Sequence, residues 1–275
     1  MYSIKKIYRR FNKHILINFV KIIDPLFDKI GIYLHPKFGE LQKYNLTYAK
    51  KSRRYLINKE KKSFNKFFID SSLSNTQLCF LGKKYPTNKS PLNSNGHRSG
   101  FTGIYTLLFS NLKNKNINIA EIGIEKNSST KIWREYFNNS KIYAFEFDKK
   151  KILKAKKNKL KKTYYTKTDV TKRNSIKKSF EKTKCKFDII IDDSTHIFED
   201  QINIIEETYK FLKKDGILII EDIYRYLKDY DESNYYMRLN HLQKEFNDIF
   251  FIESINYNNF NASWKNEKLL IFIKK

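Results

Sequence analysis

Short apolar runs alternate with longer amphipathic stretches from about residue 101 to the end of the chain. Continuous β-branched runs, such as 189–191 and 218–220, are typical of strands buried on both faces, as in a parallel sheet. Strands that alternate with helices favour an α/β fold with right-handed crossovers, here a Rossmann-like, doubly wound, mostly parallel sheet. The pattern predicts seven strands, over 118–123, 141–147, 164–167, 187–191, 217–220, 249–255 and 269–273, the last two as an antiparallel edge pair. It predicts helices near 128–137, 149–161, 174–182 and 199–212.

The first hundred residues differ in character from the rest of the chain. Residues 1–70 are basic and aromatic, with helix-like apolar spacing between Ile15 and Phe27, and they predict a mainly helical N-terminal extension. Residues 71–100 are rich in Ser, Asn, Pro and Gly and predict a linker or substrate-side loop. The Rossmann-like domain is then expected over 101–275.

The formal net charge of +26 has two interpretations. Residues 1–70 hold 17 Lys and Arg against 5 Asp and Glu, and the excess continues along the chain, so we interpret it mainly as compositional drift. The alternative is a surface that binds a polyanion such as RNA, or an anionic membrane. Nine Lys and no acid occur over 149–162, which we interpret as a solvated helix face rather than a nucleic-acid groove.

Cysteine usage and hydropathy exclude several classes of protein. Cys79 and Cys185 are far apart and outside any CxxC pair, which argues against a disulfide framework or a zinc site. No run of 18 apolar residues and no signal-peptide pattern occurs, so we expect a cytoplasmic protein. Peripheral membrane contact through the basic residues 1–70 is the alternative.

Residues at the ends of the first two predicted strands indicate a nucleotide-like cofactor, because ligands of open α/β sheets bind beyond the carboxyl ends of strands. The first strand ends with Glu121 and Gly123, and a glycine there allows a ligand to approach the backbone. Glu146 ends the second strand 23 residues later, about where an acid that binds ribose hydroxyls is expected. This spacing alone does not separate a nicotinamide cofactor from S-adenosylmethionine.

Carboxylates follow two further predicted strands. Asp192 and Asp193 end the fourth strand, and Glu221 and Asp222 end the fifth, so neighbouring strands would bring them into one crevice. Such a cluster is costly unless a cation neutralises it, and oxygen ligands favour Mg²⁺ or a similar hard ion. His196 lies three residues beyond Asp193, close enough to take the proton of an acceptor hydroxyl held there.

These elements resemble the macrocin-type O-methyltransferases, which are metal-dependent sugar methylases within the class I S-adenosylmethionine-dependent methyltransferases. The resemblance extends from about Tyr85 to Tyr224 and rests on the order and spacing of several pieces. They are Glu121-Ile122-Gly123, Trp133 to Phe137, Ile142 to Glu146, Ile191 to His196, Gln201, and Leu212 to Asp222. Departures from the family pattern are Ser194 in place of a glycine, a cofactor loop poor in glycine, and a Tyr85–Lys89 stretch that looks like a degenerate Gly-Thr-Asp-Lys element.

The resemblance implies roles for the residues at the strand ends. S-adenosylmethionine would be held by Gly123 and Glu146, with Asp169 near the adenine, and Glu121 and Asp192 are assigned to the same cofactor site. Mg²⁺ would be bound by Asp193, Glu221 and Asp222. Asp193 and His196 would be the catalytic residues, with His196 as the general base.

The predicted function is therefore S-adenosylmethionine-dependent O-methylation of a sugar, glycan or secondary-metabolite precursor, and the expected partner is a small-molecule or glycan acceptor. A nucleic-acid methyltransferase is one alternative, which the charge suggests, but no Asn/Asp-Pro-Pro-aromatic motif of amino-group methylases occurs. A non-catalytic binding module with a methyltransferase fold is the other alternative. The sequence leaves open whether the protein forms a homo-oligomer.

Overall fold

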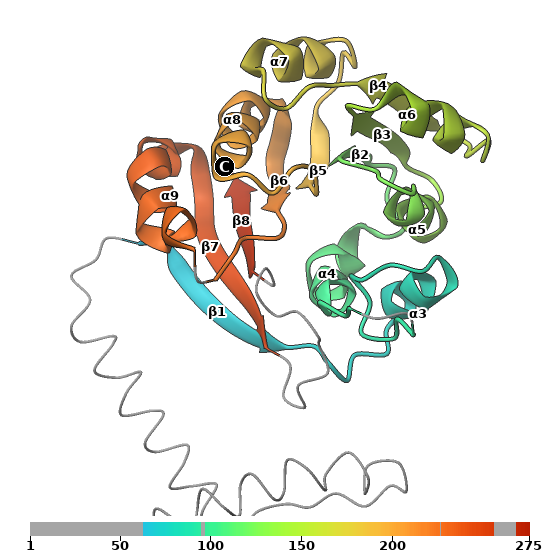
Figure 1. Ribbon diagram of the computed structural model, residues 1–275, viewed down its shortest axis with the longest axis horizontal. Helices are drawn as coiled ribbons and strands as arrows, with labels where there is room; N and C mark the ends of the chain where they lie inside the picture. The colour runs from blue at the N-terminus through green and yellow to red at the C-terminus, as the bar shows by residue number, and fades with distance from the viewer. Residues whose placement is uncertain (1–62, 95–96, 226, 256–267) are drawn as a thin grey trace, which may run out of the picture. The chain divides into compact units, whose positions relative to one another are not determined.

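The structure is a computed structural model that describes residues 63–94, 97–225, 227–255 and 268–275 (Figure 1). Its strands are β1 (Asn65–Asp70), β2 (Asn118–Ile122), β3 (Lys141–Glu146), β4 (Thr163–Lys167), β5 (Phe187–Asp192), β6 (Leu212–Ile220), β7 (Phe246–Ile255) and β8 (Lys268–Lys274). Its α-helices are α3 (Gln77–Lys84), α4 (Phe101–Phe109), α5 (Ser128–Tyr136), α6 (Lys149–Lys156), α7 (Arg173–Glu181), α8 (Phe198–Thr208) and α9 (Glu232–Leu239). Short 3₁₀ helices cover Ser110–Leu112, Tyr209–Phe211, Lys228–Tyr230 and Asn240–Glu245.

The strands of the described residues form one sheet in the order β1-β7-β8-β6-β5-β2-β3-β4 (Figure 1). All neighbouring pairs are parallel except those of β8, which runs antiparallel to β6 and β7. This confirms the expected α/β fold with a doubly wound, mostly parallel sheet. The sheet has eight strands, however, and the prediction of seven is wrong.

The additional strand is β1, which pairs in parallel with β7, with Asn65 opposite Phe250. It escapes sequence analysis because it lies at the edge of the sheet, where Phe67 and Phe68 are consecutive and both exposed, so no alternation marks it. The predicted antiparallel pair is β7 and β8. It does not lie at the edge of the sheet, because β1 pairs with the outer side of β7.

The structure tests the predictions for the first hundred residues only in part. Helix α3 lies inside the 71–100 segment that the sequence predicts to be a loop, and Thr76 caps it by accepting a hydrogen bond from the Cys79 N–H. The predicted helical extension falls almost wholly on residues 1–62, outside the described part of the chain. No helix in the described part combines the length and the apolar character needed to cross a bilayer.

The hydrophobic core lies on both faces of the sheet, as the β-branched runs predict. Ile190 packs into a cluster with residues of α7, α8 and α9, including Phe180. Its neighbours Ile189 and Ile191 pack into the other cluster with residues of α3, α4 and α5, including Trp133. Burial on both faces fixes the position of each strand end, and it therefore fixes the turns that carry the polar residues considered next.

Candidate active site

Backbone hydrogen bonds hold the turns after three central strands side by side. The Gly123 N–H bonds to the Phe145 carbonyl at 2.8 Å, and the Asp193 N–H bonds to the Ile122 carbonyl at 2.8 Å. Gly123 has a φ of +84°, and a Cβ atom there would lie 2.1 Å from the Asp193 carbonyl oxygen. Only glycine therefore allows the turns after β2 and β5 to approach so closely.

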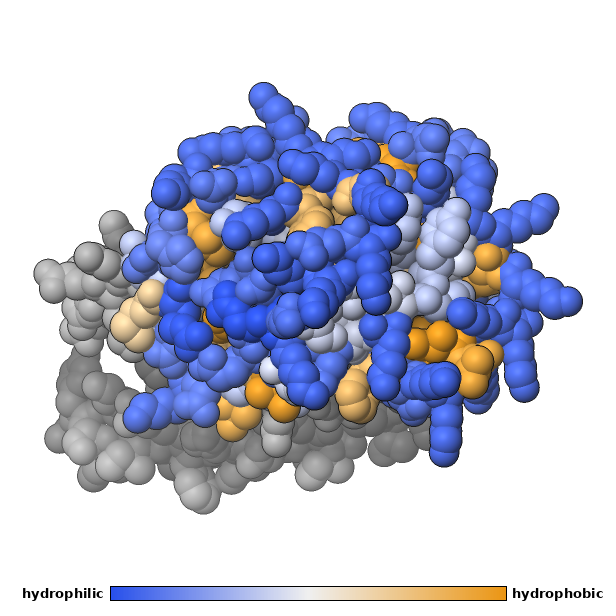
Figure 2. Space-filling view, turned by 90° about the horizontal axis from the view of Figure 1, so that it is seen from above, coloured by the Kyte–Doolittle hydropathy of each residue, from blue (hydrophilic) through white to orange (hydrophobic). Residues whose placement is uncertain are grey.

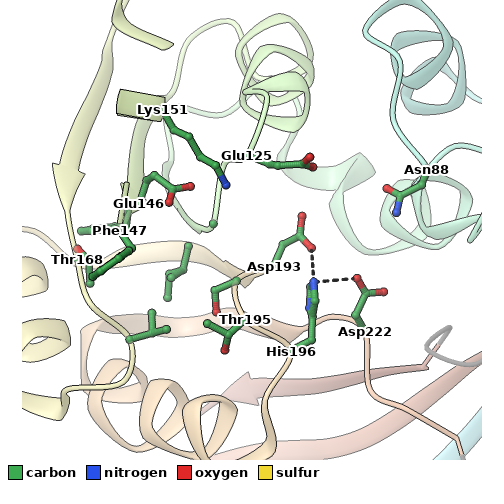
Figure 3. A pocket seen from close by; sticks show the side chains of 15 residues that line it. Asn88, Glu125, Glu146, Phe147, Lys151, Thr168, Asp193, Thr195, His196 and Asp222 are labelled. Atoms are coloured by element: carbon green, nitrogen blue, oxygen red, sulfur yellow. Dashed lines mark ion pairs between the residues drawn. The ribbon is translucent and has the colours of Figure 1, made fainter. Parts of the chain in front are cut away.

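A cavity of about 380 Å³ opens beyond these strand ends (Figure 3). Its lining includes Gly123 after β2, Glu146 and Phe147 after β3, and Asp193 and His196 after β5. This is the position at which open α/β sheets bind their ligands. The sequence prediction of a crevice at the carboxyl ends of the strands agrees with this geometry.

Glu146 is fixed at the wall of this cavity by the backbone around it. One carboxylate oxygen accepts the Ile124 N–H at 3.2 Å, and the other accepts the Asp148 N–H at 2.9 Å. Glu146 is 8% exposed, so it lies at the cavity wall and is otherwise enclosed by protein. Each oxygen keeps a further lone pair, with which the carboxylate could accept hydrogen bonds from vicinal hydroxyl groups.

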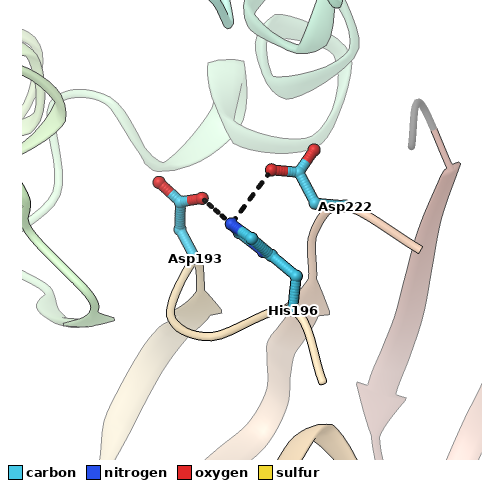
Figure 4. Close-up of side chains that lie close together, drawn as sticks. All are labelled: Asp193, His196 and Asp222. Atoms are coloured by element: carbon cyan, nitrogen blue, oxygen red, sulfur yellow. Dashed lines mark ion pairs between the residues drawn. The ribbon is translucent and has the colours of Figure 1, made fainter. Parts of the chain in front are cut away.

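Two carboxylates and an imidazole converge on the opposite side of the cavity (Figure 4). His196 Nε2 lies 3.5 Å from an oxygen of Asp222 and 3.9 Å from an oxygen of Asp193. One ligand atom of each of the three residues lies within 4.8 Å of the others, close enough to share a metal ion. His196 and Asp222 have φ values of 58° and 56°, a left-handed conformation that Asp and His adopt more readily than most residues other than glycine.

Glu221 is turned away from this group and is committed to two buried partners. Its carboxylate accepts a hydrogen bond from the Tyr105 hydroxyl at 2.5 Å and forms an ion pair with Lys89 Nζ. The same ammonium contacts Asp193 at 2.7 Å. Lys89 is 4% exposed and Glu221 is fully buried. The structure therefore brings Asp193, His196 and Asp222 together, and places Glu221 behind them in an ion pair.

The charges of this cluster depend on one another. Burial alone would lower the pKa of Lys89, but the neighbouring Asp193 and Glu221 raise it above its usual value, so the side chain stays an ammonium. Burial raises the pKa of Glu221, and Lys89 opposes that rise. Burial, followed by repulsion from Asp193, raises the pKa of Asp222 to about 6. Lys89 thus supplies one positive charge to a cluster that contains three carboxylates.

Three other residues assigned to the cofactor lie outside the cavity lining. Glu121 is fully buried and accepts hydrogen bonds from the Thr130 hydroxyl at 2.5 Å and the Trp133 indole at 2.8 Å. Asp192 accepts a hydrogen bond from the Ser194 hydroxyl at 2.6 Å, within the turn after β5. Asp169 is bonded to Thr171 and Lys172, while its neighbours Thr168 and Val170 line the cavity.

Sequence reasoning assigned no role to Lys89, Tyr105, Phe147 or Lys151. Lys89 stands in the Thr-Asn-Lys stretch of the resemblance, but its partners are 104 and 132 residues away, a separation that no local pattern reveals. Phe147 could have been predicted to line the cavity, because it directly follows Glu146 at the end of a predicted strand.

Comparison with known proteins places the chain in a family. The methyltransferase domain family profile matches residues 118–269, which is more than half of the chain. The chain therefore belongs to the methyltransferase domain family, and this membership supports S-adenosylmethionine as its cofactor. No protein in the curated set matches the chain.

Solved structures share the fold at low sequence identity. One is the MycE methyltransferase from the mycinamycin biosynthetic pathway, in complex with Mg, SAH and mycinamycin VI, at 16% identity and a TM-score of 0.54. The match covers 73% of this chain and 55% of the MycE chain, so the chain spans little more than half of that relative. Another is a protein from Klebsiella pneumoniae assigned as an O-methyltransferase, at 11% identity and a TM-score of 0.50, with 74% and 92% of the two chains covered.

The residues that line the cavity fit S-adenosylmethionine more completely than they fit the expected Mg²⁺. Gly123 and Glu146 offer a close backbone approach and a fixed carboxylate at the cavity wall, which suits a ribose-bearing cofactor. Asp193 and Asp222 direct oxygens at a shared point, with His196 beside it, which suits a divalent cation. Glu221 departs from the expected set, because both of its oxygens are engaged by Lys89 and Tyr105.

Proposed function

We propose that this chain is an S-adenosylmethionine-dependent O-methyltransferase of the macrocin type, acting on a hydroxyl group of a sugar or glycan precursor. The observation that carries the proposal is the meeting of Asp193, His196 and Asp222 on the side of the cavity opposite Glu146 (Figure 3). The cofactor would lie toward Gly123 and Glu146, and the acceptor toward the imidazole. The complex of MycE with Mg, SAH and mycinamycin VI supports the proposal through the shared fold.

The residues of the chain would act as follows. S-adenosylmethionine, when bound, supplies a methyl group on a positively charged sulfur, which is a good leaving group. Glu146 would hold its ribose, and Gly123 would let it approach the backbone. His196 Nε2 would accept the hydroxyl proton as the acceptor oxygen takes the methyl group. Enclosure of both partners beyond the strand ends would align them, which lowers the entropic part of the barrier.

A divalent cation, with Mg²⁺ the expected ion, would be held by Asp193 and Asp222. When bound, it supplies positive charge that lowers the pKa of a neighbouring acceptor hydroxyl. Lys89 neutralises Glu221 and part of Asp193 from the protein side. The remaining negative charge faces the cavity, where a cation and an acceptor hydroxyl would meet.

Calorimetric titration with S-adenosylmethionine tests the cofactor half of the proposal. We expect wild type to bind and Glu146→Gln to bind about 10- to 100-fold more weakly, because a charged hydrogen-bond acceptor is lost. Glu181→Gln is the control, because Glu181 is an exposed glutamate on α7 outside the cavity lining. We expect its affinity to stay within about threefold of wild type. Absence of binding by folded wild-type protein would overturn the proposal.

A further inference from the structure

Positive charge is concentrated in one part of the sequence. Residues 141–186 contain 18 Lys and Arg against 4 Asp and Glu, a net charge of +14, whereas residues 1–140 carry +18 over about three times that length. Residues 187–275 contain 11 Lys and Arg against 17 Asp and Glu, a net charge of −6. Uniform compositional drift would spread the excess evenly, so drift alone does not account for this segment. The sequence-based interpretation of an evenly spread charge therefore needs correction.

The fold gathers this charge at one end of the sheet, with α6 and α7 on its two faces. Residues 141–186 form β3, α6, β4 and α7, at the end of the sheet where β4 is the edge strand. All 18 basic residues are exposed, whereas Glu181 is the one exposed acid of the segment. Figure 2 looks down on the α7, β4 and α6 side of the domain and shows a mostly hydrophilic surface from which long side chains project. We call the exposed basic residues of 141–186 the basic face.

Few of these cations have an anionic partner in the protein. Lys172 pairs with Asp169, and Arg173 pairs with Glu206 and Glu207. The other 16 form no ion pair with a described residue. Elsewhere in the described chain some cations have carboxylate partners, such as Lys213 and Lys274, and others, such as Lys115 and Lys244, form no ion pair with a described residue. The basic face therefore presents charge that is available to an external anion.

The basic face is continuous with the candidate active site. Lys151, in the first turn of α6, lines the cavity beside Glu146 and Phe147. Lys167, at the end of β4, lies over the Phe147 ring with its Nζ 5.6 Å from the ring centroid. An anionic chain bound along α6 and β4 would thus lead to the mouth of the cavity.

We propose that the basic face binds an anionic glycan, and that this glycan is the body of the acceptor whose hydroxyl enters the cavity. This inference rests on the proposed function. Lysine binds carboxylate or phosphate groups as a flexible point charge, without the planar geometry that arginine gives to phosphate and base recognition. The single arginine of the face is already paired with two glutamates.

The small number of exposed aromatic side chains, two in residues 141–186, disfavours single-stranded RNA. Base stacking needs open ring faces among the cations. The exposed rings are those of Tyr164, which stacks on Tyr143 with one of its faces, and Phe147, which lines the cavity. A polymer that offers spaced negative charges and no bases fits this surface better.

Binding of polygalacturonate oligosaccharides to the full-length protein tests the inference, with neutral dextran oligosaccharides as the uncharged probe. The variant K150E/K154E/K157E reverses three exposed charges on one side of α6 and leaves Lys151 in place. We expect it to weaken polygalacturonate binding about 10- to 100-fold and to flatten the salt dependence. The matched control K115E/K214E/K244E reverses three exposed charges outside the segment and should change affinity less than about threefold.

Each alternative result has a defined meaning. Equal weakening by the two triple variants, equal binding of dextran, or no polygalacturonate binding by wild type would overturn the inference. Tighter binding of oligouridylate, or of phosphatidylglycerol vesicles, at the same ionic strength would overturn it in favour of RNA or a membrane. S-adenosylmethionine titration of the same samples separates the two proposals: retained cofactor binding without glycan binding removes only this inference. Glycan binding without cofactor binding removes the proposed function.

Discussion

At the scale of single residues, the candidate site depends on a buried cation that the protein itself supplies. Lys89 contacts the partly exposed Asp193 and the fully buried Glu221 while only 4% exposed, so it compensates a charge that water cannot reach. A buried ion pair adds little net stability, but removal of one partner leaves an uncompensated charge. The cluster is therefore expected to be sensitive to loss of this one side chain.

Lys89→Met should lower the free energy of unfolding by roughly 3–5 kcal/mol, because Glu221 would lose its counter-charge. Addition of Glu221→Gln should restore more than about 1 kcal/mol, because the orphaned charge is then removed. Denaturant unfolding of both variants, with chelator present, measures this coupling. Lys84→Met is the control, since Lys84 forms an exposed pair with Glu135 and should cost less than about 1 kcal/mol. Additive effects of Lys89→Met and Glu221→Gln would contradict the interpretation.

His196 has two conceivable roles, and one substitution separates them. As the general base, His196→Ala should reduce methyl transfer to a hydroxyl acceptor by about 10²- to 10⁴-fold and leave Mg²⁺ affinity nearly unchanged. Asp222→Asn should instead weaken Mg²⁺ binding, because it removes a charged ligand oxygen. Calorimetric Mg²⁺ titration and a methyl-transfer assay give both readouts. A large loss of Mg²⁺ affinity in His196→Ala would make the imidazole a metal ligand rather than the base.

Asp192 makes the stability of the fold depend on pH. Burial raises its pKa to about 7 in the folded protein, against about 4 in an unfolded chain. The unfolded state therefore releases this proton first, and stability is lost as pH rises from about 4 to 7. Asp192→Asn still accepts from Ser194 but does not ionise, so its advantage over wild type should grow by up to about 4 kcal/mol over this range. Unfolding with chelator at several pH values tests this, and a constant difference would contradict it.

At the scale of secondary-structure elements, Glu121 joins helix α5 to strand β2. Its two oxygens accept hydrogen bonds from Thr130 and Trp133, both of which lie on α5. The sequence placed Glu121 in the cofactor site because it precedes Gly123. The structure instead places it beneath α5, the helix that follows the turn after β2, where it would stabilise the packing of that helix.

Glu121→Leu should destabilise the protein by roughly 2–5 kcal/mol, because two buried donors lose their acceptor. Glu121→Gln keeps one acceptor oxygen and should cost about 1 kcal/mol. For Glu121→Gln, the affinity for S-adenosylmethionine should remain within about threefold of wild type. Thermal unfolding and calorimetry measure the two quantities, and a large loss of affinity without loss of stability would restore the binding role.

Elements with a strong pattern could be predicted from sequence, and those fixed by distant contacts could not. The runs at 189–191 and 218–220 predicted β5 and β6, and several of the acids at the strand ends line the candidate cavity. Strand β1 was missed because an edge strand with two exposed Phe residues lacks a buried face. The ion pair of Lys89 with Glu221 was missed because only the tertiary fold brings them together.

At the scale of the whole molecule, the charge is asymmetric, with +18 on residues 1–140, +14 on the much shorter segment 141–186 and −6 on residues 187–275. The asymmetry can be read from the sequence. It was missed because the charges were counted only for residues 1–70 and for the rest of the chain together. Like charges crowded on α6, β4 and α7 repel one another, and this repulsion destabilises the folded state when no anion is bound. Salt screens exposed charges over about 10 Å at 0.1 M ionic strength.

The protein should therefore become more stable as ionic strength rises from about 0.01 to 0.3 M, because screening weakens the repulsion within the basic face. K150E/K154E/K157E should be more stable than wild type at low salt by about 0.5–1 kcal/mol and should show a smaller salt effect. A Glu at position 150 lies in the first turn of α6, where negative charge is favourable. Thermal unfolding with sodium chloride measures both effects, with K115E/K214E/K244E as the control of equal charge. If both triple variants respond to salt alike, the repulsion is a property of the net charge and not of this face.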